Sequence, residues 1–187
     1  AGAGRGAPHV HPGHRAVARR AVRESQVLLK DEGLLPLPKT GRILLAGSAA
    51  DNVGLQCGGW TLTWQGLSGN AVPGTSLLEA LREVGGSGVE VVVVEDPEAI
   101  AALMKDGDLA IVASGERPYA EGQGDDRVLA FRPADLEYIR AFEAAGVPVL
   151  TVLFSGRPLM IGEALASSRA FVAGFLPGTE AGGLADL

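Results

Sequence analysis

The sequence has little of several features that mark particular classes of protein. Its single cysteine, Cys57, has no partner for an internal disulfide and no second thiol for a zinc site. Basic residues are outnumbered, with 16 Lys and Arg against 22 Asp and Glu, which disfavours binding to nucleic acid or to an anionic membrane surface. No apolar run approaches the roughly 18 residues of a membrane-spanning helix. We therefore expect neither nucleic acid nor a membrane as a partner.

The N-terminal residues also lack an apolar core of the length that a secretory signal needs. Residues 1–13, AGAGRGAPHVHPG, are rich in Gly, Ala and Pro, and we interpret them as a linker or an expression remnant. His9, His11 and His14 have a spacing that could hold a metal ion, but a structural metal site requires a closed and ordered set of ligands. We therefore expect no metal site.

What the sequence does contain is apolar and glycine-rich. Apolar residues make up 47% of the chain, enough for a packed core, which excludes disorder throughout. Glycine accounts for 27 of the 187 residues, about twice its usual share of ~7%. This abundance indicates many tight turns and loops in which the backbone comes close to another group.

Short, continuously apolar segments alternate with segments of helical spacing. Strands are predicted over 42–46, 89–94, 109–114, 147–153 and 170–174. Helices are predicted over 14–30, 76–84, 97–105, 132–145 and 161–166, with a last one beginning at 180. The pattern predicts a doubly wound α/β sandwich over 14–187, in which a mostly parallel sheet of five or six strands has helices on both faces.

Two long polar loops follow the first and third predicted strands, over 48–75 and 115–131. In a doubly wound sheet of order 2-1-3-4-5 these two strands are neighbours, and the chain reverses its direction between them. Ligands bind in the crevice at the carboxyl ends of such strands. The two loops are therefore expected to build one site together.

Each loop offers candidate functional side chains. Glu116 follows a strand and a glycine, and a carboxylic acid held there against aromatic surface can act as a general acid. Trp60 and Trp64 lie among glycines in the other loop, and a tryptophan face can stack on a sugar ring. The residues alone leave two other interpretations open: a solvated acidic loop edge, and tryptophans buried beneath a loop.

Other chemistries find less support. The turn at 47–52, GSAADN, lacks the glycine pattern that cradles a pyrophosphate. Cys57 has no suitably spaced histidine nearby, which disfavours a thiol nucleophile. No Gly-x-Ser-x-Gly sequence is present, which argues against an α/β-hydrolase.

Several segments together resemble glycoside hydrolase family 3, in particular the second, α/β sandwich domain of its β-glucosidase and exo-β-glucanase members. These segments are RESQVLLKDEGLLPLP (23–38), ILLAGSAADNVGLQCGGWTLTWQG (43–66), PGTSLLEALR (73–82), GERPYAEGQGD (115–125), LFSGRPL (153–159) and FLPGTEAGGLADL (175–187). The resemblance is collinear from about residue 14 to the last residue, which makes it far more specific than any single motif.

The resemblance implies a retaining hydrolase whose active site lies between two domains. A (β/α)₈ barrel that precedes the sandwich would supply the aspartate nucleophile, and the sandwich would supply the acid/base glutamate and an aromatic wall. On the matching motifs, Glu116 becomes the catalytic acid/base, and Trp60, Trp64 and Glu121 become substrate-binding residues. The implied substrate is a β-linked glucoside or glucan with a terminal glucosyl residue, and the implied mechanism requires no cofactor.

The sequence departs from the family pattern in two ways. It contains no barrel and therefore no candidate nucleophile, so we expect the chain to be part of a longer enzyme and to be inactive alone. It also ends within a helix after PGTEAGG, which we interpret as a truncated C-terminus. Two alternatives are a non-catalytic module that binds carbohydrate or docks a partner, and a flavodoxin-like regulatory or nucleotide-binding domain that shares only the topology.

Overall fold

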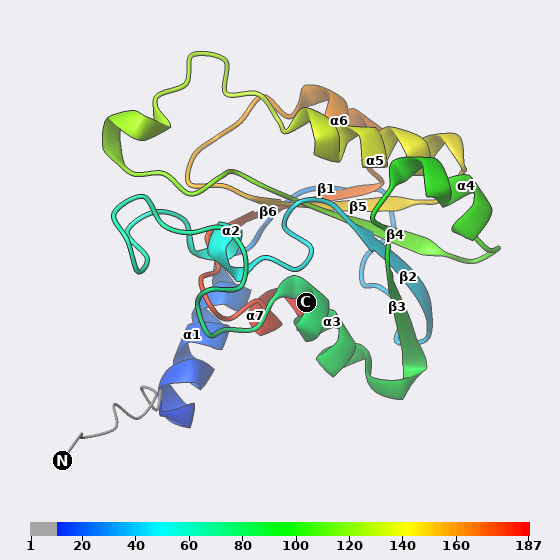
Figure 1. Cartoon of the computed structure of the whole chain (residues 1–187). Coiled ribbons are helices and arrows are strands. Elements are labelled where there is room, and N and C mark those ends of the chain that lie inside the picture. The colour runs from blue at the N-terminus through cyan, green and yellow to red at the C-terminus, as the bar shows by residue number, and fades with distance from the viewer. Residues whose placement is uncertain (1–10) are drawn as a thin grey trace.

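The computed structural model describes residues 11–187, which form one six-stranded sheet with helices on both faces (Figure 1). The strand order is β1-β6-β5-β4-β2-β3, and all neighbours are parallel except β1 and β6. The strands are β1 (Val27–Asp31), β2 (Gly41–Ala46), β3 (Val89–Val93), β4 (Leu109–Gly115), β5 (Val149–Phe154) and β6 (Ala170–Phe175). The predicted α/β sandwich is thus confirmed, and so is the predicted order of its five parallel strands.

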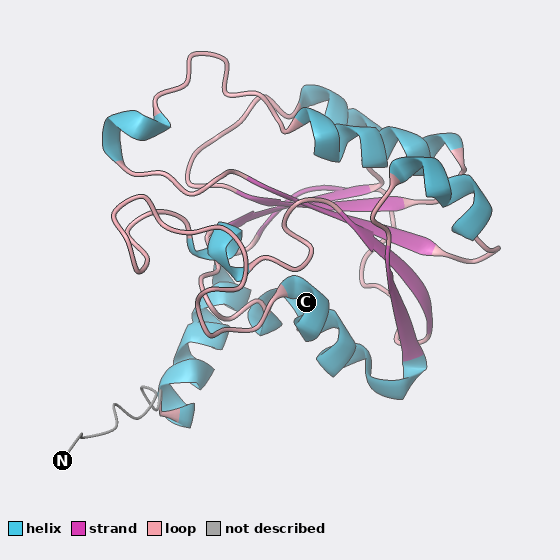
Figure 2. Ribbon diagram, in the orientation of Figure 1, coloured by secondary structure: helices cyan, strands magenta, loops and turns pink. Residues whose placement is uncertain are grey.

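The helices divide between the two faces of the sheet (Figure 2). One face carries α1 (Pro12–Ser25), α2 (Val53–Cys57), α3 (Leu77–Gly85) and α7 (Gly182–Ala185). The other face carries α4 (Ile100–Leu103), α5 (Pro133–Ala144) and α6 (Gly162–Ser167). Short 3₁₀ turns occur at Gly86–Gly88, Pro97–Ala99 and Glu121–Gly124.

Alternate residues of each strand enter two separate cores, because successive side chains of a strand point to opposite faces. Leu45 packs on the α2 and α3 side, and its neighbour Leu44 packs on the α5 side against Ile139 and Phe142. All six residues of the central strand β5 are buried. Burial on both faces explains why the strand sequences are continuously apolar rather than alternating.

The predicted helix over 14–30 is wrong in its last five residues. The helix α1 ends at Ser25, Gln26 is extended, and the next residues form the strand β1. This strand pairs antiparallel to β6, with Val27 opposite Ala173. A short apolar run suits a helix or a strand equally well, and pairing with a distant segment decides between them.

The ends of other helices agree with their sequence signals. Ser76 and Glu79 form the expected capping box of α3, in which the Ser76 Oγ accepts from the Glu79 backbone N–H and the Glu79 carboxylate accepts from the Ser76 N–H. The helix α1 begins at Pro12, so it includes two residues of the segment 1–13 that we interpreted as a linker. Residues 1–10 of that segment lie outside the described part of the chain.

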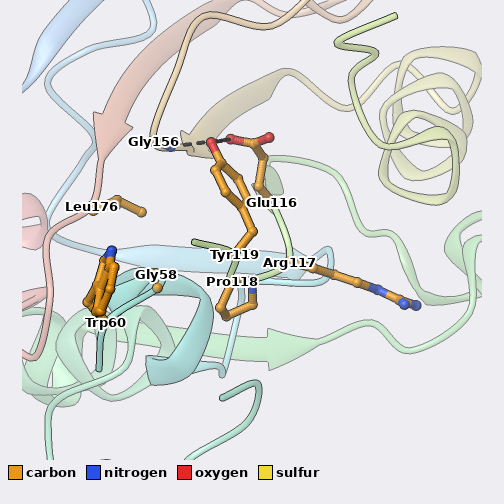
Figure 3. Close-up of a pocket in the computed structure, with 9 residues that line it drawn as sticks. Gly58, Trp60, Glu116, Arg117, Pro118, Tyr119, Gly156 and Leu176 are labelled. Atoms are coloured by element: carbon orange, nitrogen blue, oxygen red, sulfur yellow. Dashed lines mark hydrogen bonds between the residues drawn. The ribbon is translucent and has the colours of Figure 1, made fainter. Parts of the chain in front are cut away.

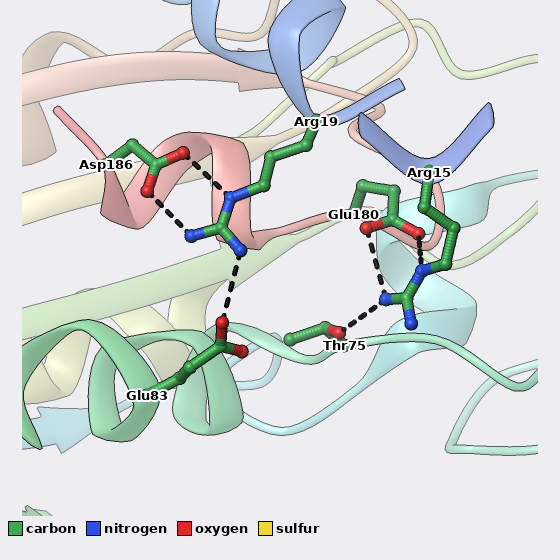
Figure 4. Close-up of polar contacts among 6 residues, drawn as sticks. All are labelled: Arg15, Arg19, Thr75, Glu83, Glu180 and Asp186. Carbon is green, nitrogen blue, oxygen red and sulfur yellow. Dashed lines mark hydrogen bonds and ion pairs between the residues drawn. The ribbon is translucent and has the colours of Figure 1, made fainter. Parts of the chain in front are cut away.

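Ion pairs attach α1 to residues on either side of α7 and to α3 (Figure 4). Arg15 donates to both oxygens of Glu180, at 2.6 and 3.1 Å. Arg19 donates to both oxygens of Asp186, at 2.8 and 2.7 Å, and to Glu83 at 3.2 Å. Two arginines one helical turn apart thus hold the N-terminal helix against the C-terminal segment.

Candidate functional site

A buried carboxylate ties together the ends of the two strands from which the long loops leave. Asp135, on the first turn of α5, is 2% exposed. It accepts hydrogen bonds from the Ser48 backbone N–H at 2.8 Å, the Ser48 hydroxyl at 2.7 Å and the Ser114 hydroxyl at 2.7 Å. Ser48 follows β2 and Ser114 lies in β4, so these bonds fix the starting points of both loops.

The two loops also contact each other directly. The Gln65 side chain accepts from the Ala120 backbone N–H at 2.9 Å and donates to the Ala120 carbonyl at 3.2 Å. Gly59 lies so close to the other loop that a Cβ at this position would stand 2.0 Å from the Tyr119 carbonyl oxygen. The expectation that the two loops converge is therefore confirmed, and that they build one functional site stays a prediction.

A cavity opens where these loops meet the carboxyl ends of the strands (Figure 3). It is lined by Gly58, Gly59, Trp60, Glu116, Arg117, Pro118, Tyr119, Gly156 and Leu176. These residues follow β2, β4, β5 and β6, so four parallel strands contribute to it from the same edge of the sheet. This is the edge at which doubly wound sheets bind ligands.

Glu116 is the first residue after β4, and its position is fixed by backbone and side-chain contacts. Its backbone N–H donates to the Phe154 carbonyl at 3.0 Å, which extends the pairing of β4 with β5 by one residue. Its Oε1 accepts from the Arg157 Nε at 2.9 Å, and its Oε2 accepts from the Tyr119 hydroxyl at 3.4 Å and the Gly156 N–H at 3.3 Å. The side chain is 13% exposed, so a carboxyl group at the cavity is held in one orientation.

Arg157, in the loop after β5, was not singled out by the sequence reasoning. Its guanidinium pairs with Glu116, lies 4.5 Å from the centre of the Tyr119 ring, and donates through Nη1 to the Gly124 carbonyl. Burial and the negative charge of Glu116 raise the pKa of Tyr119, and the charge of Arg157 partly offsets this rise. The available signal was its place in LFSGRPL, directly after the strand that neighbours β4.

The two tryptophans lie on the surface rather than in the core. Trp60 is 69% exposed and Trp64 is 51% exposed, so the interpretation as buried loop residues is wrong. Their ring centres are 6.4 Å apart with planes tilted by 57°, and the Trp60 backbone N–H donates to the Trp64 carbonyl at 3.0 Å. Trp60 lines the cavity, whereas Trp64 lies next to Trp60 and is not among the lining residues. Together they form an exposed aromatic wall beside Glu116.

Glu121 lies further along the same loop as Glu116. It begins the 3₁₀ turn Glu121–Gly124 and is exposed, and it is not among the residues that line the cavity. Of the four residues expected to form the site, the structure places Glu116 and Trp60 in the lining of one cavity. Trp64 lies against Trp60 but does not line the cavity, and Glu121 also lies outside it.

Glu116 is the one carboxylate that lines the cavity, as far as the described residues show. Within 11–187 no three His, Cys, Asp or Glu side chains lie close enough to hold a metal ion, and His9 lies outside this range. Burial raises the pKa of the Cys57 thiol, which disfavours the reactive thiolate. The same part of the chain contains no helix with the length and apolarity needed to cross a bilayer.

This arrangement suits proton transfer to or from a bound polar molecule. A carboxyl group within hydrogen-bonding reach of a ligand oxygen can act as a general acid or base. An exposed indole offers a flat apolar face with a polar edge, which suits a ligand that has both kinds of surface. The cavity thus combines a carboxyl group, Glu116, with the exposed indole of Trp60 and the ring of Tyr119.

The sequence and the fold of this chain are similar to those of known glycoside hydrolases. Residues 26–186 match the family model for the glycosyl hydrolase family 3 C-terminal domain. A lysosomal β-glucosidase of Dictyostelium discoideum is 31% identical, over 90% of this chain and 23% of its own length.

Solved structures match over nearly the whole chain. The exo-1,3/1,4-β-glucanase of a Pseudoalteromonas species is 40% identical with a TM-score of 0.85, over 94% of this chain and 22% of that one. The β-glucosidase of Listeria innocua, solved with gluconolactone, is 33% identical with a TM-score of 0.81, over 96% of this chain and 25% of that one. The chain thus spans about a quarter of the length of these relatives.

Proposed function

The chain belongs to glycoside hydrolase family 3 as its C-terminal domain, and from this we propose that it carries the acid/base carboxyl group, Glu116, of a retaining β-glucosidase or exo-β-glucanase. The substrate of the complete enzyme is a β-linked oligo- or polysaccharide from which a terminal glucosyl residue is released. The observation that carries the proposal is the position of Glu116, the carboxylate held at the cavity beside the exposed wall of Trp60.

In the first step of a retaining reaction, a second carboxylate attacks the anomeric carbon and the glycosidic C–O bond breaks. Glu116 gives its proton to the departing oxygen, so the leaving group departs as a neutral alcohol and Glu116 becomes a carboxylate. Because the two carboxyl groups stand only ~5–5.5 Å apart in retaining enzymes, the nucleophile must reach the same cavity from another domain. We assign it to a (β/α)₈ barrel partner.

In the second step Glu116 acts as a base. Its carboxylate takes a proton from water while the water oxygen attacks the anomeric carbon, and the bond to the nucleophile breaks. Glucose leaves and Glu116 is protonated again, ready for the next cycle. No metal or organic cofactor takes part in either step.

The aromatic wall would bind the part of the substrate that leaves first. The indole of Trp60 stands at the cavity with the residue 69% exposed, and Trp64 extends the same surface outward. A flat, equatorially linked sugar presents C–H groups that pack well on such faces. Glu121, which lies outside the cavity, would contact only a saccharide that extends beyond this wall.

The test is a chimera in which this chain replaces the corresponding domain of the Listeria innocua β-glucosidase, with which it aligns over 96% of its length. We expect Glu116→Gln to slow the hydrolysis of cellobiose by about 10²–10⁴-fold, the usual contribution of general acid catalysis. A dinitrophenyl β-glucoside needs no such assistance in the first step, so its kcat/KM should hardly change, whereas its kcat, which includes the second step, should fall. Glu137→Gln, at an exposed position of α5, is the matched control.

A specific observation favours one other function, a module that binds carbohydrate without catalysing its cleavage. The exposed tryptophan pair could serve such a module equally well. In that case the Glu116→Gln chimera would hydrolyse both substrates as fast as the parent chimera. That result would leave the Trp60 wall as a binding surface only.

A further inference from the structure

Arg157 is the side chain that connects Glu116 with the loop beyond it. Its Nε donates to Glu116, its Nη1 donates to the Gly124 carbonyl, and its planar face covers the Tyr119 ring. Among residues 11–187 it is the only ion-pair partner of Glu116. The Arg157 side chain is 25% exposed, so water only partly screens the pair.

Arg157 makes the two oxygens of the Glu116 carboxyl group unequal. Oε1 receives a charge-assisted hydrogen bond at 2.9 Å, within the normal range for an N–H donor. Oε2 has only contacts of 3.3 and 3.4 Å, from the Gly156 N–H and the Tyr119 hydroxyl, which are longer than good hydrogen bonds. A proton on Oε1 would have to displace the guanidinium N–H, whereas a proton on Oε2 displaces no strong bond.

We propose that Arg157 is a positioning residue that makes Oε2 of Glu116 the oxygen that gives and receives the proton. This inference rests on the proposed acid/base role of Glu116. In the first step the Oε2–H proton passes to the departing oxygen, and in the second Oε2 takes a proton from water. The guanidinium keeps its own protons throughout, holds Oε1 in both protonation states, and balances the carboxylate formed between the two steps.

The three contacts of Arg157 require the planar guanidinium of an arginine, and a positive charge alone is not enough. One planar guanidinium meets a carboxylate, a backbone carbonyl and an aromatic face at once. A lysine ammonium is a compact charge on a flexible stem and cannot make all three contacts together. Lysine at this position should therefore restore the function only in part.

The activity test uses the same chimera and pair of substrates. We expect Arg157→Gln to lower kcat/KM for cellobiose by about ten- to a hundredfold, and to change kcat/KM for the dinitrophenyl glucoside much less, because that quantity reports a first bond cleavage that needs no acid. Arg157→Lys should fall between Gln and the parent. In the double variant with Glu116→Gln, the loss of Arg157 should add almost nothing, because both changes disable the same two proton transfers of Oε2. Arg140→Gln, which breaks an exposed ion pair with Glu163, is the control.

The outcomes separate this inference from the proposed function. If Glu116→Gln slows cellobiose selectively but Arg157→Gln slows both substrates equally, Arg157 is merely structural, and the inference fails while the proposed function stands. If Glu116→Gln itself shows no preference between the substrates, the proposed function fails.

A second measurement needs only this chain. The Nε–H of an arginine gives its own proton–nitrogen NMR signal, and Arg157→Lys identifies the signal of Arg157 by removing it. We expect the Arg157 Nε–H to exchange with water more slowly than that of Arg140, whose pair with Glu163 is exposed, and to lose this protection in Glu116→Gln. Equal exchange at the two arginines in the unaltered chain would overturn the inference.

Discussion

Trp60 has a backbone conformation that few side chains adopt, with a φ of 61°. For a non-glycine residue this left-handed region costs roughly 1–2 kcal/mol. The residue also exposes most of its surface to water, so burial gives little in return. A strained residue with an exposed aromatic side chain at a cavity is a candidate for a role in the site rather than in the stability of the fold.

The Trp60→Gly variant separates these two roles. Glycine tolerates the positive φ but increases the freedom of the unfolded chain, so the free energy of unfolding should change by less than about 1 kcal/mol. The dissociation constant for cellobiose should rise at least about tenfold, an effect of about 1.4 kcal/mol. Urea unfolding and calorimetric titration of the chain measure the two quantities.

Leu62→Gly is the matched control for this prediction. Leu62 has the same φ of 61° and is 67% exposed, but it does not line the cavity. It should show the same small change in stability and keep its affinity for cellobiose. A loss of affinity in both variants would show that the shape of the loop, and not the indole, binds the sugar.

Gly59 is required for a different reason, the close approach of the two loops. An added Cβ would meet the Tyr119 carbonyl oxygen at 2.0 Å, and backbone cannot move aside as a flexible side chain can. Gly59→Ala should lower the free energy of unfolding by about 1–3 kcal/mol. Gly122→Ala places a Cβ where nothing lies within 4 Å, and it should change stability by less than about 0.5 kcal/mol. Urea unfolding that shows equal losses for both would contradict the observed packing of the loops.

At the scale of elements, the attachment of α1 depends on ionised carboxylates. The hydrogen bonds from Arg19 lower the pKa of Asp186, so the folded state favours its ionised form. A lowered pKa stabilises the protein at pH values above the unfolded pKa of about 3.9, and this stabilisation disappears as the pH falls through the lower folded value. The helix should therefore loosen in acid.

The Asp186→Asn variant tests this pH dependence. The parent should exceed the variant in stability by up to about 1 kcal/mol at neutral pH, since the pair is partly exposed. This difference should shrink below about pH 4. Hydrogen exchange of residues 12–25 and unfolding curves at several pH values give the comparison. Glu24→Gln, which alters the exposed pair with Arg20 on the same helix, should show no such trend.

At the scale of the whole molecule, the cavity contains only half of the groups that the proposed reaction needs. Glu116 is the one carboxylate lining it within residues 11–187, and a retaining mechanism requires two. The isolated chain should therefore release no chromophore from an aryl β-glucoside above the background rate. Turnover by the pure chain that disappears in Glu116→Gln would refute this prediction.

The parallel sheet was predictable because its five strands are short, continuously apolar runs that alternate with helices. The strand β1 was not, since only its contact with Val172 and Ala173 of β6 distinguishes the run at 27–29 from the end of a helix. The place of Glu116 and Trp60 at one cavity was predictable from loops that follow neighbouring strands, while their roles stay predictions. Arg157 was not, because its role depends on a contact with a residue 41 positions away. Local patterns thus revealed elements and loops, while contacts between distant segments had to be observed.

The two hydrogen bonds between Gln65 and Ala120 make the loops one mechanical unit. This bridge links the loop that carries Trp60 and Trp64 to the loop that carries Glu116, so we expect the two loops to move together. In the proposed two-domain enzyme, the packing of the two domains then determines one distance, that between the Glu116 carboxyl group and the nucleophile of the barrel. A shift of one domain against the other would therefore change the activity through this distance alone.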